Sequence, residues 1–196
     1  MARAIERRTV AAPDLHITAD GPRRIFGHAA LFDSPSEDLG GFREQIRPGA
    51  FAESLTHDDV RALFNHDPNI ILGRNRAGTL VLTEDQRGLG IEITPPDTQA
   101  ARDLLVSIER GDITQMSFGF VVKPEGQVWQ RDGEGHVLRT LTSVRLFDVS
   151  PVVFAAYADT AVAVRALEAW HNRAIGPPIS LLRRRLDLAL LQVAAH

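Results

Sequence analysis

The apolar residues of this chain occur mainly in a series of short segments separated by turn residues. Between residues 24 and 154 these segments are RIFGHAALF, VRALFN, ILG, GTLVLTED, GLGIEIT, TQMSFGFVV and SVRLFDVSPVVF. They are short for helices, and the β-branched and aromatic residues in them are typical of strands. Strands at this spacing favour an antiparallel barrel or sandwich. Gly27, inside the first segment, indicates a bulge or bend.

One segment between the strands has the period of a helix. PDTQAARDLLVSIERGD (96–112) offers Asp97 or Thr98 as the residue that caps the helix start, and Gly111 as a left-handed end. A second, shorter helix is expected over 50–55, after a Pro-Gly turn. The apolar stripe of the longer helix consists of Ala101, Leu104, Leu105 and Ile108.

The composition changes along the chain in a way that suggests three parts. Residues 1–20 are mixed and polar and are expected to form a flexible N-terminal arm, and residues 21–158 form the β-rich body. Residues 159–196 are expected to form a helical C-terminal tail, broken at GPP. Apolar residues near the end recur at helical spacing (Ile179, Leu182, Leu186, Leu190 and Val193). This helix could pack on the body or on a second copy of the chain, or it could dock to an assembly partner or be removed.

Composition narrows the function classes. The 196-residue chain has 44% hydrophobic residues and a net charge of −3, so we expect a globular protein without direct nucleic-acid binding. It has no cysteine, which excludes disulfides, thiolate zinc sites and a cysteine nucleophile. No apolar run has the length of a signal peptide or a membrane span, so we expect an intracellular protein.

The stretch TQMSFGFVV (114–122) pairs a serine with a glycine on one side of a strand. Met116, Phe118 and Phe120 form the apolar face, and Ser117 and Gly119 point the other way. One interpretation is a tight place in the core. The other is that Ser117 is a nucleophile and that Gly119 leaves space for the substrate backbone.

A serine nucleophile needs a base, and histidine suits that task near neutral pH. Of the seven histidines, His28 and His66 lie in or at the end of apolar strand segments. His66 is expected to end the strand face that runs through Phe64. The alternative is a structural histidine whose ring N–H donates a hydrogen bond to a neighbouring carbonyl oxygen.

Asp148 is the candidate residue that orients the base. It is expected to share a strand face with Val144 and Leu146, and buried carboxylates are rare unless they are paired. The residues alone leave open whether its partner is a histidine or an arginine, Arg139 or Arg145. A metal site made from His66, Asp67 and Asp58 has no recurrent ligand spacing, so neither a metal nor another cofactor is expected.

Several sequence blocks, in order, resemble the prohead serine proteases of tailed bacteriophages. The blocks run from about residue 24 to residue 158: GHAALFDSPS, FREQIRPGAF, ALFNHDPNIILGR, PDT…ARDLL…IERGDI, MSFGF and LFDVSPVVFAAY. This family is distantly similar in fold to the herpesvirus assemblins. The resemblance therefore implies an α+β, mainly β fold with a closed or nearly closed antiparallel β-barrel and peripheral helices.

The resemblance also implies the site and the partners. His66 of the FNHD block would be the general base, Ser117 of MSFGF the nucleophile, and Asp148 of LFDVS the orienting acid, a position where many relatives have glutamate. The enzyme would be a serine endopeptidase that cleaves the scaffold segment of the major capsid protein, and itself, inside the procapsid in the host bacterial cytoplasm. The portal and a second copy of the chain are further expected partners, and no membrane contact is expected.

Three other functions are compatible with the sequence. The chain could be a non-catalytic capsid assembly or scaffold protein on the same fold. It could be the same protease serving a gene-transfer agent or a domesticated prophage particle. It could also be a β-barrel binding domain, in which case the ordered blocks would be a coincidence.

Overall fold

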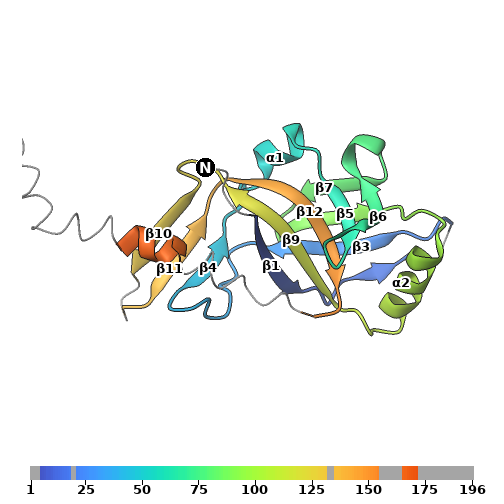
Figure 1. The fold of residues 1–196 in the computed structure, drawn as a ribbon, viewed down its shortest axis with the longest axis horizontal. Helices are drawn as coiled ribbons and strands as arrows, with labels where there is room; N and C mark the ends of the chain where they lie inside the picture. The colour runs from blue at the N-terminus through green and yellow to red at the C-terminus, as the bar shows by residue number, and fades with distance from the viewer. Residues whose placement is uncertain (1–4, 19–20, 132–134, 155–164, 172–196) are drawn as a thin grey trace, which may run out of the picture.

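The structure is a computed structural model that describes residues 5–18, 21–131, 135–154 and 165–171. Within these residues the chain forms twelve strands in three sheets, with short helices at the periphery (Figure 1). The mainly β class predicted from the short apolar segments is confirmed.

The five-stranded sheet contains the strand with Ser117. Its order is β1 (Glu6–Ala11), β9 (Gln115–Val122), β12 (Val144–Val152), β5 (Arg61–Phe64) and β6 (Asp67–Arg74). β9 pairs antiparallel with both β1 and β12, whereas β12 and β5 run parallel. Met116, Phe118 and Phe120 are fully buried on one face of β9, as their alternation predicts. The edge strand β1 falls within the arm expected over residues 1–20.

The second sheet packs against the first instead of joining it in a barrel. Its order is β2 (His16–Ile17), β3 (Ile25–Leu31), β8 (Gly88–Ile93) and β7 (Leu80–Glu84), and β3 lies against β9 and β1. The predicted closed or nearly closed barrel is wrong: among the described residues β1 and β6 end one sheet, and β2 and β7 end the other. Two facing sheets bury their apolar faces without closure, so the strand pattern alone does not separate a sandwich from a barrel.

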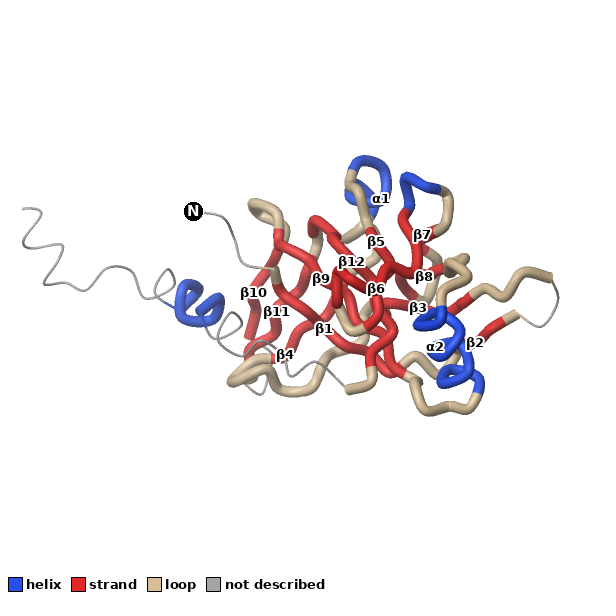
Figure 2. Tube along the Cα trace, turned by 45° about the vertical axis from the view of Figure 1, so that its right-hand side comes forward, coloured by secondary structure: helices blue, strands red, loops and turns tan. Residues whose placement is uncertain are grey.

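The helices cover the ends of these sheets (Figure 2). α1 (Ala52–His57) lies against β12 and β7 and starts two residues later than expected. α2 (Gln99–Glu109) lies against β2 and β6. The Thr98 side chain accepts a hydrogen bond from the Ala101 N–H, and Gly111 has a φ of 78°, so both predicted ends of this helix are confirmed. Its predicted apolar stripe is buried.

A buried ion cluster joins the third sheet to β1. This sheet has the order β10 (Gln127–Arg131), β11 (Val137–Leu141) and β4 (Arg43–Ile46). Arg139 and Arg8 each bind both Glu6 and Glu44, and all four residues are at most 7% exposed. Burial would raise the pKa of Glu6, but the hydrogen bonds and charges of Arg139 and Arg8 outweigh it and lower that pKa. The cluster therefore connects β1 to β4 and β11 of the third sheet.

Only part of the predicted C-terminal tail is described. Residues 165–171 are helical, and their Trp170 stacks on Trp129 of β10 at 5.6 Å between ring centroids. The second predicted tail helix, with Ile179 to Val193, lies outside the described residues. None of the described helices combines the length and apolar character that crossing a membrane requires.

Candidate active site

Ser117 lies in the middle of β9, on the face of the sheet opposite Met116 and Phe118. Thr9 of β1 pairs with it on one side and Ser150 of β12 on the other. Directly paired residues of neighbouring strands share a face, so this row of side chains lies together. Ser117 is fully buried.

A cavity beside β1 is not lined by Ser117. It has a volume of about 430 Å³ and lies between β1 and the loop that precedes β4. Phe118, whose side chain points away from the Ser117 face, contributes to its lining. Neither His66 nor Asp148 lines it, so this cavity is separate from the candidate site residues.

His66 lies in a tight turn between β5 and β6. Asn65 has a φ of 52° and His66 a φ of 58°, so both central residues of this two-residue hairpin are left-handed. Phe64 pairs with Asp67 across the turn. The prediction that His66 continues the strand face through Phe64 is therefore wrong, because the strand ends at Phe64 and the turn redirects the imidazole.

Asn65 attaches this turn to the end of β12. Its backbone N–H donates to the Pro151 carbonyl at 3.0 Å, and its Oδ1 accepts from the Val153 N–H at 3.0 Å. Asparagine tolerates the left-handed conformation better than most residues do. This double attachment places His66 beside β12, although the two segments are more than 80 residues apart in sequence.

A β-bulge brings Asp148 to the Ser117 face. Leu146 pairs with Phe120, but Asp148 pairs with Gly119, so Phe147 is an extra residue in β12. Without the bulge, strict alternation would put Asp148 on the same face as Leu146, as the sequence predicts. That prediction is wrong, because the extra residue moves Asp148 to the opposite face, where Ser117 and Ser150 lie.

The structure brings together the three residues that the sequence nominates. His66 Nε2 lies 2.7 Å from Ser117 Oγ, and His66 Nδ1 lies 2.5 Å from Asp148 Oδ2. The side chains of His66 and Asp148 are 6% and 12% exposed. If Nδ1–H donates to the carboxylate, Nε2 is left to accept the Ser117 hydroxyl proton. This geometry is suited to nucleophilic acyl transfer.

Gly119 makes room for Asp148 and not for a substrate. A Cβ atom added at Gly119 would lie 2.4 Å from Asp148 Oδ1, far inside van der Waals contact. The expectation that the space beside Gly119 receives substrate backbone is therefore wrong, since the carboxylate occupies it. The MSFGF block thus holds both the serine and the space for its acidic neighbour.

Replacing Gly119 by alanine is expected to displace the Asp148 carboxylate. We expect kcat to fall by about 100-fold, because small misplacements of catalytic groups have effects of that size. We also expect the free energy of unfolding to fall by roughly 1–3 kcal/mol from the clash. Steady-state kinetics and urea unfolding measure the two effects. In an Asp148→Ala background the Gly119→Ala change should cost almost no stability, and an undiminished cost there would contradict the steric explanation.

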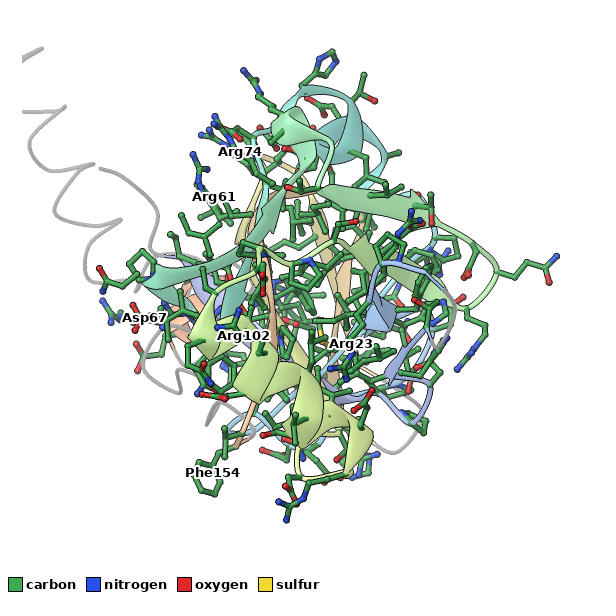
Figure 3. All side chains as sticks on the ribbon, turned by 90° about the vertical axis from the view of Figure 1, so that its right-hand side faces the viewer. Arg23, Arg61, Asp67, Arg74, Arg102 and Phe154 are labelled. Carbon is green, nitrogen blue, oxygen red and sulfur yellow. The ribbon has the colours of Figure 1, made fainter. Side chains whose placement is uncertain are left out.

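The alternative partners of Asp148 are engaged elsewhere. Arg139 binds Glu6 and Glu44, and Arg145 pairs with Asp58 at 3.3 Å. Asp67 lies at the edge of the molecule in Figure 3 and accepts from the Asn69 backbone. Within the described parts of the chain, no group of three His, Asp or Glu side chains is arranged to hold a metal ion.

His28, the other strand histidine, lies in a separate cluster on β3. Its Nδ1 is 2.5 Å from Asp14 Oδ2, and its Nε2 is 2.9 Å from Asp85 Oδ2. Arg87 pairs with the same Asp14 oxygen at 3.1 Å. Burial would lower the pKa of His28, but its hydrogen bonds to the two carboxylates outweigh it and raise that pKa above 6.5. His28 Nε2 lowers the pKa of Asp85 to about 2.

The cluster around His28 is expected to make the free energy of unfolding depend on pH. Because the folded-state pKa of His28 is raised, its contribution is complete below about pH 6.5 and is lost as the pH rises through the raised value. The Asp85 contribution has the opposite sign: it is present above pH 3.8 and is lost as the pH falls toward 2. Thermal melting at pH 6 and at pH 9 should therefore show a fall in Tm at the higher pH that is smaller in His28→Gln. An equal fall in both proteins would contradict this role.

Sequence reasoning missed one polar residue at the site. Ser150 is fully buried and lies beside Asp148 and His66. The available signal was its spacing, because a residue two positions after Asp148 on a strand shares its face. Because the sequence predicts the wrong face for Asp148, this spacing alone does not bring Ser150 to the Ser117 face.

Comparison with known proteins identifies the family of the chain. The family model described as caudovirus prohead serine protease matches residues 9–173, which is most of the chain. The match extends beyond the sequence blocks at both ends and includes the helical residues 165–171. No curated protein and no solved structure shows a significant match.

Proposed function

Because the chain belongs to the caudovirus prohead serine protease family, and is therefore a serine peptidase of capsid maturation, we propose that Ser117 is its nucleophile, His66 its general base and Asp148 its orienting acid. The observation that carries this proposal is the continuous hydrogen-bonded series from Ser117 Oγ through both His66 nitrogens to Asp148 Oδ2. Each member comes from a different strand or turn, so chance alignment of a single motif does not explain it.

The roles follow from the geometry. Ser117 Oγ attacks the scissile carbonyl carbon while His66 Nε2 takes the hydroxyl proton, and the resulting imidazolium is stabilised by Asp148. His66 then gives the proton to the leaving amine, which completes the acyl-enzyme. A water molecule then attacks the acyl carbon while His66 takes its proton. His66 returns this proton to Ser117 Oγ, and the carboxylic acid product leaves.

The substrate is the scaffold segment of the major capsid protein, together with the protease itself. The family relates the chain to capsid proteins. We place the reaction inside the procapsid, in the cytoplasm of the bacterial host, with the portal and a second copy of the chain as further partners. Substrate must displace part of what surrounds Ser117, since that side chain is fully buried in this structure.

Co-expression with the capsid protein of the same particle tests this function. Intact masses should show a shortened capsid chain and a shortened protease with the native sequence, and full-length chains with Ser117→Ala. If particles assemble and both chains stay whole with the native protein, a non-catalytic assembly function is the better explanation. The source of the particle, whether phage, prophage or gene-transfer agent, then determines which biological process the cleavage serves.

A further inference from the structure

Ser150 is a fourth polar residue at the site, and neither the family match nor the sequence blocks assign it a role. It lies on β12 directly opposite Ser117 of β9, and it is fully buried. Its Oγ lies 2.9 Å from Asp148 Oδ2 and 3.4 Å from His66 Nδ1. Asp148 Oδ2 is the same oxygen that His66 Nδ1 contacts at 2.5 Å.

The donor directions follow from the chemistry of these groups. An ionised carboxylate only accepts hydrogen bonds, so the Ser150 hydroxyl donates its single proton to Asp148 Oδ2. His66 Nδ1–H donates to that oxygen as well. The longer contact between Ser150 Oγ and His66 Nδ1 is at the outer limit of hydrogen-bond length and contributes little.

We infer that Ser150 is a positioning residue that holds the Asp148 carboxylate in the orientation His66 requires, an inference that rests on the proposed roles of Ser117, His66 and Asp148. The terminal torsion angle of an aspartate has a broad distribution, so a carboxylate that accepts from only one hydrogen-bond donor can rotate. Here Oδ2 has two donors, while Oδ1 occupies the space left by Gly119. Together these contacts fix both oxygens.

Kinetics separates this role from ordinary core packing. Ser150→Ala removes one donor to a charged acceptor, so we expect kcat to fall by about 10- to 100-fold with KM nearly unchanged. Ser150→Thr keeps the hydroxyl and should recover most of the loss. Thr140→Val is the matched control: it removes another buried hydroxyl hydrogen bond, to Gln45 in the three-stranded sheet, and kcat should not change. The substrate is a peptide that spans the cleavage site mapped by co-expression.

A spectroscopic measurement tests the same inference without activity. In full-length Ser117→Ala protein, proton NMR should show the His66 Nδ1–H far downfield, as expected for a short hydrogen bond to a carboxylate. Adding Ser150→Ala should move this signal upfield or broaden it through exchange with water, whereas adding Thr140→Val should leave it in place.

The two measurements give distinguishable outcomes. An unchanged kcat in a folded Ser150→Ala protein, together with an unchanged Nδ1–H signal, would overturn the positioning role and leave Ser150 as a packing residue. If the native protein cleaves nothing, the proposed function fails, and the NMR signal still decides whether Ser150 orients Asp148. If Ser150→Thr does not fold, Ser150→Cys, with its weaker donor, should give a kcat between those of serine and alanine.

Discussion

Replacing Ser117 by alanine is expected to lower the rate of capsid-protein cleavage by at least about 10⁴-fold. The side chain that His66 Nε2 contacts at 2.7 Å is then absent, and no other described hydroxyl lies in an equivalent position on that nitrogen. Folding should be little affected, because alanine is smaller than serine and suits the buried site. Initial cleavage rates on purified capsid protein, together with Tm, measure both effects.

The control for this variant is Thr140→Val, which changes a buried hydroxyl in the three-stranded sheet. It should cleave at the native rate. If Ser117→Ala also retains the native rate while remaining folded, the nucleophile is another residue and the assignment of the site is wrong.

Replacing Asp148 by asparagine is expected to lower kcat by roughly 10³- to 10⁴-fold, with little change in KM. The change conserves shape but removes the charge that stabilises the imidazolium. It also allows the amide to donate to Nδ1, which leaves the proton on Nε2 and directs it at Ser117 instead of leaving a lone pair there. Steady-state kinetics on the mapped peptide measures the change.

The matched control is Asp85→Asn. Asp85 contacts the Nε2 atom of His28, so the variant alters a second aspartate–histidine pair outside the site. Its kcat should equal that of the native protein, although its stability should fall. Equal losses of activity in Asp148→Asn and Asp85→Asn would mean that the Asp148 effect is a general loss of structure.

Local sequence signals predicted the elements that depend on neighbouring residues. Thr98 and Gly111 define the ends of α2, and the spacing of its apolar residues defines its buried face. The alternation of Met116, Phe118 and Phe120 predicts the apolar face of β9, and all three residues are buried. These features depend only on residues that are close in sequence, so they can be predicted from the local pattern.

Features that depend on pairing between strands far apart in sequence cannot be predicted from neighbouring residues. The bulge at Phe147 is defined by the register between β12 and β9, and it reverses the side on which Asp148 lies. The attachment of β1 to the three-stranded sheet involves the buried cluster formed by Glu6, Glu44, Arg8 and Arg139, which come from separate parts of the chain. Sheet closure depends on pairing between edges, for which the strand segments carry no signal.

The candidate site shows both cases. The three residues that the ordered sequence blocks indicate, Ser117, His66 and Asp148, lie within hydrogen-bond distance of one another in series, although the strand faces expected for His66 and Asp148 are wrong. The sequence indicates that Gly119 is unusual, but the prediction of substrate clearance is wrong, because the carboxylate that fills its space comes from another strand. Ser150 followed only once the register of β12 was known.

Covalent labelling with a fluorophosphonate, using a preparation that cleaves its capsid substrate, tests whether Ser117 is a nucleophile activated by His66. An activated serine displaces fluoride and keeps the phosphonyl group, so intact mass counts the adducts and peptide mapping locates them. We expect one adduct, on Ser117, that forms far more slowly in His66→Gln and at the native rate in His28→Gln. An adduct on a different serine, or labelling of Ser117 that does not depend on His66, would contradict this expectation.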